Sequence, residues 1–183
     1  MSTATTPPTP AVRPAAILIG PPGAGKTTVG PLVAARLGVD FLDTDAAVEA
    51  VAGKPVGDLF IEDGEQVFRA LERDAVAAAI AGHAGVIGLG GGAVLDEGTR
   101  ALLAGRPVVY LETGFAVAAR RVGLDKPRPL LLGNPRAQLK ALLEQRLPIY
   151  AKLAWMTVRT DGRAPEEIAA EITAQLGARE PGQ

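Results

Sequence analysis

The feature that most constrains this chain is a glycine-rich segment that links an apolar run to a run expected to be helical. Residues 20–28 read GPPGAGKTT, and they lie between the apolar residues 15–19 and a helix predicted over 29–37. The pattern G-x-x-x-x-G-K-[ST] in this setting is typical of a phosphate-binding loop. Its glycines let successive backbone N–H groups point at phosphate oxygens, at a helix N-terminus whose dipole favours negative charge. We therefore predict a nucleotide-phosphate site, with Lys26 reaching the β- and γ-phosphates and the Thr27 hydroxyl binding Mg²⁺.

Length and composition favour a single cytoplasmic domain. The chain has 183 residues, of which 48% are hydrophobic, enough for one core of substantial size. A net charge of −1 provides no basic field for nucleic acid or anionic membranes, so we expect neither as a partner. The absence of cysteine excludes disulfides and thiolate metal sites, and no apolar run approaches the roughly 20 residues that span a bilayer. We expect residues 1–14, rich in Thr and Pro, to be a disordered extension and residues 178–183 to be a loose tail.

Short apolar segments alternate with Ala- and Leu-rich segments along the chain. The apolar segments predict strands over 15–19, 39–43, 85–89, 107–111 and 155–159. The others predict helices over 29–37, 44–51, 56–61, 65–81, 97–104, 114–121, 136–147 (ending at Pro148) and 165–176. Such alternation is typical of a parallel sheet covered by helices on both faces, whose ligands bind beyond the carboxyl ends of the strands. We predict a three-layer α/β domain over residues 15–177 with a five-stranded parallel sheet.

An acidic pair ends the second predicted strand. Asp43 and Asp45 flank Thr44, which we expect to be the N-cap of the following helix. Because the chain turns where the strand ends, the two carboxylates can serve different partners, Asp43 the hydrated Mg²⁺ and Asp45 a hydroxyl whose proton it takes. The alternative is an acidic pair that only caps a helix. Glu112, after the strand over 107–111, imitates the metal-binding acid of many ATPases, but we expect it to be the ordinary solvated end of a buried strand.

A second candidate region combines three glycines with an arginine. Gly90, Gly91 and Gly92 follow the third predicted strand, and three consecutive glycines suggest a backbone that must come close to something. Their N–H groups can bind a hydroxyl of an acceptor molecule, whereas a tight turn alone needs only one or two glycines. Arg69, with Glu72 three residues later, fits either a plain ion pair or the binding of a small carboxylic acid. By itself, the ion pair is the simpler interpretation.

The segment 122–135 differs from the rest because it is charged and contains several glycines and prolines, which predicts a mobile lid. Arg128 lies in it between two prolines and is the candidate cation that closure brings over the γ-phosphate. Arg121 precedes the segment and fits either a nucleotide contact or a cation at a helix C-terminus. We expect His83 to lie at a solvated helix end and Trp155 to lie in the core.

Together these motifs resemble those of the shikimate kinase family, within the nucleoside-monophosphate-kinase-like group of P-loop enzymes. The matching segments occur in the family's order and approximate spacing, and they are residues 20–28, 41–45 (FLDTD), 68–69 (FR), 90–92 (GGG), 128–131 (RPLL) and 146–150 (RLPIY). Many families share the phosphate loop, whereas the combination of Asp-Thr-Asp, three glycines and Arg-Pro is specific. The departures are small: Thr27 stands where many members have serine, and the N-terminal extension has no counterpart in these motifs.

The resemblance implies a role for each matching residue. Shikimate would be held by Asp45, Arg69, Arg146, Gly90, Gly91 and Gly92, with the two arginines on its carboxylate and Asp45 on its ring hydroxyls. ATP would contact Gly23, Ala24, Gly25, Lys26, Thr27, Thr28, Arg121, Arg128 and Pro165, with Arg121 and Pro165 bordering the adenine. Mg²⁺ would be bound through Thr27 and Asp43. The implied catalytic residues are Lys26, Asp45 and Arg128, and residues 44–72 would form a substrate-binding subdomain.

The reaction that the resemblance implies is transfer of the γ-phosphate of ATP to the 3-hydroxyl of shikimate, in the biosynthesis of chorismate and aromatic amino acids, by a monomer. One alternative is another small-molecule kinase of this group, such as a gluconate kinase. Such an enzyme keeps the phosphate loop but has no evident need for three glycines with two carboxylate-binding arginines. Another alternative is a GTP switch or a non-catalytic nucleotide-binding module. Against it, the chain lacks an Asn-Lys-x-Asp guanine-reading motif, and the acidic pair would have no use.

Overall fold

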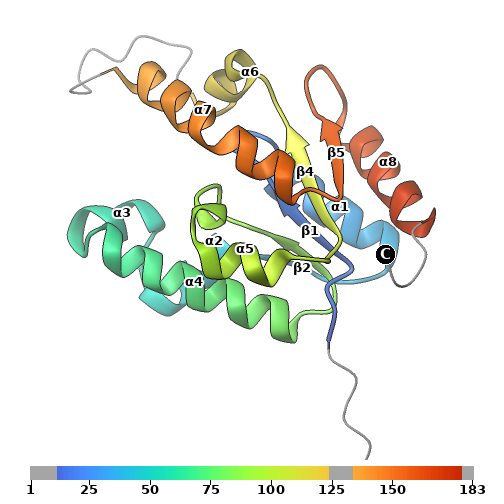
Figure 1. Cartoon of the computed structure of the whole chain (residues 1–183), viewed down its shortest axis with the longest axis horizontal. Coiled ribbons are helices and arrows are strands. Elements are labelled where there is room, and N and C mark those ends of the chain that lie inside the picture. The colour runs from blue at the N-terminus through green and yellow to red at the C-terminus, as the bar shows by residue number, and fades with distance from the viewer. Residues whose placement is uncertain (1–11, 124–133, 179–183) are drawn as a thin grey trace, which may run out of the picture.

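The computed structural model describes residues 12–123 and 134–178, and it has the predicted three-layer α/β fold (Figure 1). The strands are β1 (Ala16–Ile19), β2 (Phe41–Asp43), β3 (Val86–Gly88), β4 (Val108–Glu112) and β5 (Met156–Arg159). They form one five-stranded sheet in the order β2-β3-β1-β4-β5, and every neighbouring pair is parallel, so the predicted sheet is confirmed. The helices are α1 (Lys26–Leu37), α2 (Thr44–Ala52), α3 (Val56–Glu62), α4 (Glu65–Gly82), the 3₁₀ helix η1 (Ala93–Leu95), α5 (Glu97–Leu103), α6 (Phe115–Arg121), α7 (Pro135–Leu153) and α8 (Pro165–Ala178).

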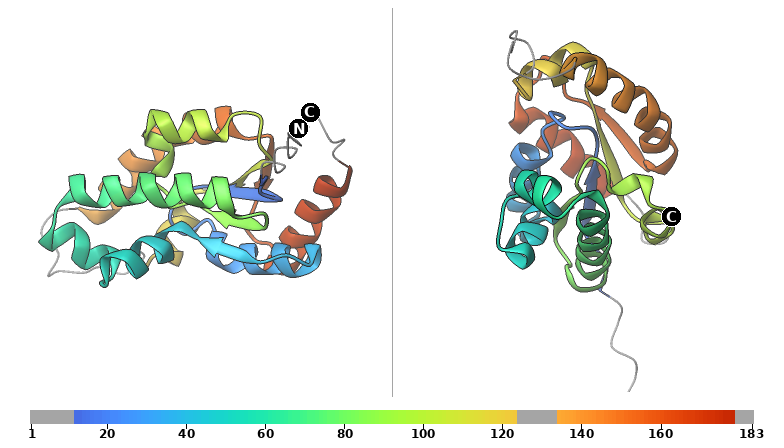
Figure 2. Two further views of the ribbon diagram at one scale, coloured as in Figure 1. Left: turned by 90° about the horizontal axis from the view of Figure 1, so that it is seen from below. Right: turned by 90° about the vertical axis from the view of Figure 1, so that its left-hand side faces the viewer.

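Helices cover both faces of the sheet because the central strand β1 is apolar on both sides. Successive side chains of a strand point to opposite faces. Ala16 and Leu18 pack into a core shared with α1 and α8, whereas Ile17 and Ile19 pack into a second core shared with α4, α5 and α7. All four residues are fully buried. The two helical layers are visible on either side of the sheet in Figure 2. Among the described residues, no helix is both long enough and apolar enough to cross a membrane.

Helix α1 approaches strand β2 closely because residue 30 is a glycine. A methyl group on Gly30 would lie 2.2 Å from the ring of Phe41, so no other residue fits there without displacing that ring. Phe41 begins β2, the strand that ends at Asp43, and α1 begins at Lys26. The contact therefore packs the helix that begins with the phosphate-loop lysine directly against the strand that ends at Asp43.

Residues 44–72, predicted to bind the substrate, form α2, α3 and the first part of α4. Val48, Leu59 and Phe68 form a small core of their own, separate from the two cores against the sheet. Helix α3 lies at the opposite end of the molecule from α8 (Figures 1 and 2). This segment therefore depends on a few apolar contacts of its own rather than on the main cores.

Two predictions about helix ends are wrong. Helix α7 continues through Pro148 to Leu153, although a proline inside a helix removes a hydrogen bond and crowds the preceding turn. Arg146 and Tyr150 on either side of Pro148 are both buried, and such packing stabilises a helix more than propensity does. Asp43, not Thr44, caps α2, because its Oδ1 accepts the N–H of Asp45 at 2.9 Å.

Two further features were misplaced or missed by the sequence reasoning, Trp155 and the helix η1. Trp155 is 37% exposed instead of lying in the core, because it precedes the edge strand β5. The short helix η1 follows the three glycines and was not predicted. His83 follows the end of α4 as expected, but its Nε2 also lies 3.2 Å from the carbonyl oxygen of Asp40.

Candidate active site

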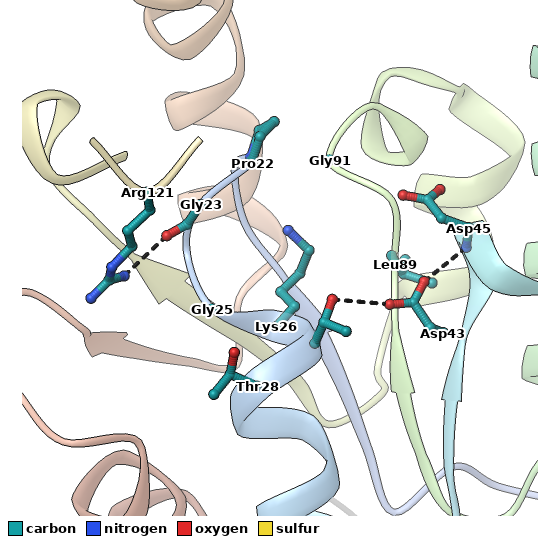
Figure 3. A pocket seen from close by; sticks show the side chains of 11 residues that line it. Pro22, Gly23, Gly25, Lys26, Thr28, Asp43, Asp45, Leu89, Gly91 and Arg121 are labelled. Carbon is teal, nitrogen blue, oxygen red and sulfur yellow. Dashed lines mark hydrogen bonds between the residues drawn. The ribbon is translucent and has the colours of Figure 1, made fainter. Parts of the chain in front are cut away.

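The carboxyl ends of the central strands surround a cavity of about 540 Å³. Its lining comes from the phosphate loop, the end of β2, the residues after β3 and the end of α6 (Figure 3). The lining residues are Pro22, Gly23, Gly25, Lys26, Thr27, Thr28, Asp43, Asp45, Leu89, Gly91 and Arg121. Most of the residues that the sequence analysis assigned to nucleotide, metal or acceptor thus face one space.

Lys26, the first residue of α1, projects between the phosphate loop and Gly91 (Figure 3). Its Nζ donates to the carbonyl oxygens of Gly20 at 2.6 Å and Pro21 at 3.0 Å. Burial lowers the pKa of Lys26 to about 8, against the opposing effect of the nearby Asp45 and Asp43 carboxylates. Bound phosphates would add negative charge beside the ammonium group and favour its protonated form. The loop therefore holds a cation ready for a polyanion.

Thr27 and Asp43 place two oxygen atoms side by side at the cavity wall. The Thr27 hydroxyl donates to Asp43 Oδ2 at 3.2 Å (Figure 3). In the part of the chain that the structure describes, no group of three or more His, Asp or Glu side chains gathers to hold a metal. The pair nevertheless fits Mg²⁺, which is usually bound through one or two carboxylates together with substrate phosphates and waters. Glu112 does not line the cavity, and its carboxylate lies 3.4 Å from Arg159 instead.

Asp45 lies opposite the lysine and is arranged as a free hydrogen-bond acceptor. Burial raises the pKa of Asp45 to about 6, and the Asp43 and Glu72 carboxylates act in the same direction. Its Oδ1 atom is buried and accepts no hydrogen bond from any described residue. A methyl group on Gly90 would lie 2.4 Å from that oxygen, which explains why position 90 has no side chain. The cavity therefore contains a weakly acidic carboxyl group with an unused acceptor.

The three glycines 90–92, here called the glycine turn, also lie against Arg69. A methyl group on Gly92 would be 2.4 Å from Arg69 Nη1. Arg69 forms the predicted ion pair with Glu72 at 2.5 Å, and its guanidinium lies 5.0 Å from the centre of the Phe68 ring. Glu72 is only 4% exposed, so this pair is not the plain surface contact that its spacing suggested. Arg69 is therefore held in place next to the glycine turn.

Arg146 brings a second buried cation to the same region from α7. It is 8% exposed, and its Nε atom is buried without a hydrogen-bond partner in the described part of the chain. Burial is the largest effect on two neighbouring groups, since it lowers the pKa of Lys26 and raises that of Glu72. The Arg146 charge adds a smaller lowering effect on the pKa of each. Arg146 thus lies within electrostatic reach of both the phosphate loop and the Arg69 pair.

Arg121, the last residue of α6, connects the phosphate loop to the loop after β5. Its guanidinium donates to the carbonyl oxygen of Gly23 at 3.0 Å and to the Thr160 hydroxyl at 3.2 Å. At the other end of α6, the Asp161 carboxylate accepts the Thr113 hydroxyl at 2.7 Å and the Gly114 N–H at 2.8 Å. The loop after β5 therefore holds α6 at both of its ends.

Some assigned residues do not line the cavity, including the shikimate-assigned Arg69, Gly90, Gly92 and Arg146. Ala24 is fully buried behind the loop, and Pro165 begins α8 without reaching the lining. Arg128 and most of the predicted lid over 122–135 lie outside the described residues. Thr44 has a role that sequence reasoning missed, because its hydroxyl donates to the Gly88 carbonyl at 3.3 Å and accepts the Gly90 N–H at 3.1 Å. No local pattern distinguishes such a tertiary contact from a helix cap.

Comparison with known proteins agrees with this geometry. A model of the shikimate kinase family matches residues 22–177. The chain belongs to the shikimate kinase family. A shikimate kinase from Thermobifida fusca is 66% identical over 166 residues, which cover 91% of this chain and 96% of that protein. Among solved structures, the shikimate kinase from Acinetobacter baumannii in complex with shikimate is 36% identical with a TM-score of 0.83, covering 91% of this chain and 94% of that chain.

More distant kinases share the architecture. A gluconokinase from Sinorhizobium meliloti 1021 is 20% identical with a TM-score of 0.53, over 92% of this chain and 94% of that chain. At this identity the likeness concerns the fold alone. The predicted membership of the shikimate kinase family is therefore confirmed, and the gluconate kinase alternative gains no support beyond the common fold.

Proposed function

We propose that the chain transfers the γ-phosphate of ATP to the 3-hydroxyl of shikimate, giving ADP and shikimate 3-phosphate. One observation carries the proposal: two buried polar atoms of opposite character lack partners among the described residues. Asp45 Oδ1 is an acceptor and Arg146 Nε is a donor. Leaving a buried polar group unpaired costs about 1–3 kcal/mol, so a ligand that pairs with both is favoured. Shikimate carries hydroxyl groups for the first atom and a carboxylate for the second.

The other charged groups agree with a site in which cations bind the carboxylate of shikimate and a carboxylate binds its hydroxyl groups. Arg69 and Arg146 provide guanidinium donors for the carboxylate, which they match with two parallel hydrogen bonds. Asp45, with a pKa of about 6, is ionised at neutral pH and accepts the proton of the attacking hydroxyl. Lys26 and the phosphate-loop N–H groups stabilise the charge of the transferred phosphoryl group.

We also propose that Mg²⁺ takes part. Thr27 and Asp43 would hold it, since their oxygen atoms already lie 3.2 Å apart at the phosphate loop. When bound, the ion neutralises charge on the β- and γ-phosphates. The expected cytoplasmic location, the monomeric state and the absence of nucleic-acid or membrane partners stay predictions.

The arginine that faces the glycine turn tests the proposal. Arg69→Lys keeps the charge but removes the fork of donors, so it should weaken shikimate binding by about 1.5–3 kcal/mol, about 10- to 150-fold, and leave ATP binding unchanged. Arg73→Lys is the matched control, because Arg73 is exposed on the same helix one turn later and should bind shikimate like the parent. Calorimetric titration with shikimate, gluconate and ATP measures all three proteins. If the parent does not bind shikimate, or if Arg69→Lys binds it equally well, the assignment fails.

A further inference from the structure

Tyr150, which none of the roles above includes, holds the glycine turn from α7. Its hydroxyl donates to the carbonyl oxygen of Gly91 at 2.5 Å. The side chain is fully buried, and its ring stacks on Tyr110 with 5.3 Å between ring centres. Burial raises the pKa of Tyr150 to about 12, against the opposing charge and hydrogen-bonding effects of the adjacent Arg146 guanidinium, so the hydroxyl remains a donor at neutral pH.

The held carbonyl determines where the next N–H points. In a trans peptide unit the C=O and the following N–H point in opposite directions, so fixing the Gly91 carbonyl fixes the Gly92 N–H on the side away from Tyr150. The N–H groups of the residues before Gly91 and after Gly92 already form hydrogen bonds within the chain. The Gly90 N–H donates to the Thr44 hydroxyl, and the Ala93 N–H donates to the Gly90 carbonyl. Within residues 12–123 and 134–178, the Gly91 and Gly92 N–H groups have no acceptor. Because glycine is the least restricted residue, the peptide between Gly91 and Gly92 could rotate if the Tyr150 hydroxyl did not hold it.

We infer that Tyr150 is a positioning residue for the acceptor substrate. Its hydroxyl keeps the peptide between Gly91 and Gly92 in the orientation that leaves the Gly92 N–H available to an oxygen atom of that substrate. The inference rests on the proposed function, because it assumes that the substrate binds beside the glycine turn. Helix α7 then acts twice: Arg146 contributes a cation directly, and Tyr150, one turn later, orients a backbone donor.

Gly91 lies where the acceptor side of the site meets the phosphate loop. A methyl group on Gly91 would lie 3.0 Å from Cδ of Pro22 in the phosphate loop, so the turn and the loop are in contact. Gly91 also lines the cavity. The peptide that Tyr150 holds therefore borders the space where the phosphoryl group passes from one substrate to the other.

The neighbouring tyrosine provides a matched control for the test. Tyr110 is buried in the same ring stack, and its hydroxyl has no partner among the described residues. Tyr150→Phe and Tyr110→Phe each remove one buried hydroxyl and keep the ring, so both should fold. Tyr150→Phe should raise the KM for shikimate about three- to tenfold and leave the KM for ATP unchanged, because it removes one hydrogen bond that orients the acceptor side. Tyr110→Phe should change neither KM.

A second measurement does not depend on activity. The amide signals of Gly91 and Gly92 in ¹H–¹⁵N spectra of the ligand-free proteins should move or broaden in Tyr150→Phe and stay in place in Tyr110→Phe. Unchanged amide signals would overturn the inference even if the KM for shikimate rose, because the loss of the interaction between the Tyr150 hydroxyl and Arg146 would then explain the higher KM. An equal rise of both KM values would also overturn it, since general loosening explains that result. If the parent fails to bind shikimate, the proposed function fails, and the amide signals alone then decide whether Tyr150 orients the turn.

Discussion

At the scale of single residues, two titratable groups define the pH range in which the site is ready to react. Burial raises the pKa of Asp45 to about 6 and lowers that of Lys26 to about 8. Asp45 must be ionised to take a proton and Lys26 must be protonated to bind phosphate. We therefore expect the rate measured with both shikimate and ATP well below their KM values, which reports the free enzyme, to rise as the pH increases through about 6 and to fall as it passes about 8.

Asp45→Asn isolates one limb of this profile. The variant has no carboxyl group to titrate, so the rise near pH 6 should disappear, and kcat should fall by about 10²- to 10⁴-fold because the general base is lost. Steady-state rates measured across the pH range for the parent and the variant check both effects. A rise near pH 6 that persists in Asp45→Asn would assign it to another group.

Asp43 and Glu112 offer a second comparison at this scale, since each is the last residue of a strand of the sheet. Asp43 accepts the Thr27 hydroxyl at the cavity wall, whereas Glu112 pairs with Arg159 away from it. Asp43→Asn should therefore lower turnover strongly and raise the Mg²⁺ concentration needed for half-maximal rate. Glu112→Gln should leave both close to the parent values. Rates measured against Mg²⁺ concentration separate the two, and the reverse ranking would make Glu112 the metal-binding acid.

At the scale of elements, the glycine turn has no side chains because neighbouring groups occupy the space beside it, among them Asp45 beside Gly90 and Arg69 beside Gly92. Gly92 has an ordinary backbone conformation with φ −93°, so alanine meets no backbone strain there. Its methyl group would instead displace the Arg69 guanidinium, and we expect Gly92→Ala to weaken shikimate binding at least about tenfold with ATP binding unchanged. Gly57→Ala in α3 is the control, since a methyl group there meets nothing within 4 Å and should stabilise the helix by about 0.5–1 kcal/mol. Calorimetry and thermal melting test the pair, and normal shikimate affinity in Gly92→Ala would contradict this account.

The same elements explain how far the sequence could predict the site. The phosphate loop and the glycine turn are local patterns whose chemistry follows from residue type, and the loop and Gly91 of the turn line the cavity. Thr44 and Tyr150 act through partners 44 and 59 residues away, and no local spacing reveals such contacts. Pro148 was misjudged for the same reason, because the packing of Arg146 and Tyr150 outweighs its local effect on α7.

At the scale of the whole molecule, the strand order divides the site into two sides. Helices α2, α4 and α7 and the glycine turn after β3 supply the groups assigned to shikimate. The phosphate loop, α6 and the start of α8 supply described groups assigned to ATP, and the loop after β5 holds α6 in place. Asp161→Ala removes the acceptor that holds the start of α6 and should raise the KM for ATP about three- to tenfold, with shikimate affinity unchanged. Asp74→Ala, at an exposed position on α4, is the control and should leave the KM for ATP and the affinity for shikimate unchanged. Equal effects of Asp161→Ala on both substrates would show that the two sides do not act separately.

The contact between Gly30 and Phe41 has a consequence for the distance between the phosphate loop and Asp43. With no side chain at residue 30, the ring of Phe41 packs directly against the backbone of α1. Lys26 and Asp43 stand at the ends of these two elements, so an incompressible ring sets how far the phosphate donor lies from the acidic edge. Protein interiors pack as densely as crystals, and the partly buried ring of Phe41 is rigid, so neighbouring changes cannot compress it. The separation is thus a dimension built into the scaffold, and adaptation to other acceptors must come from the side chains and the glycine turn around it.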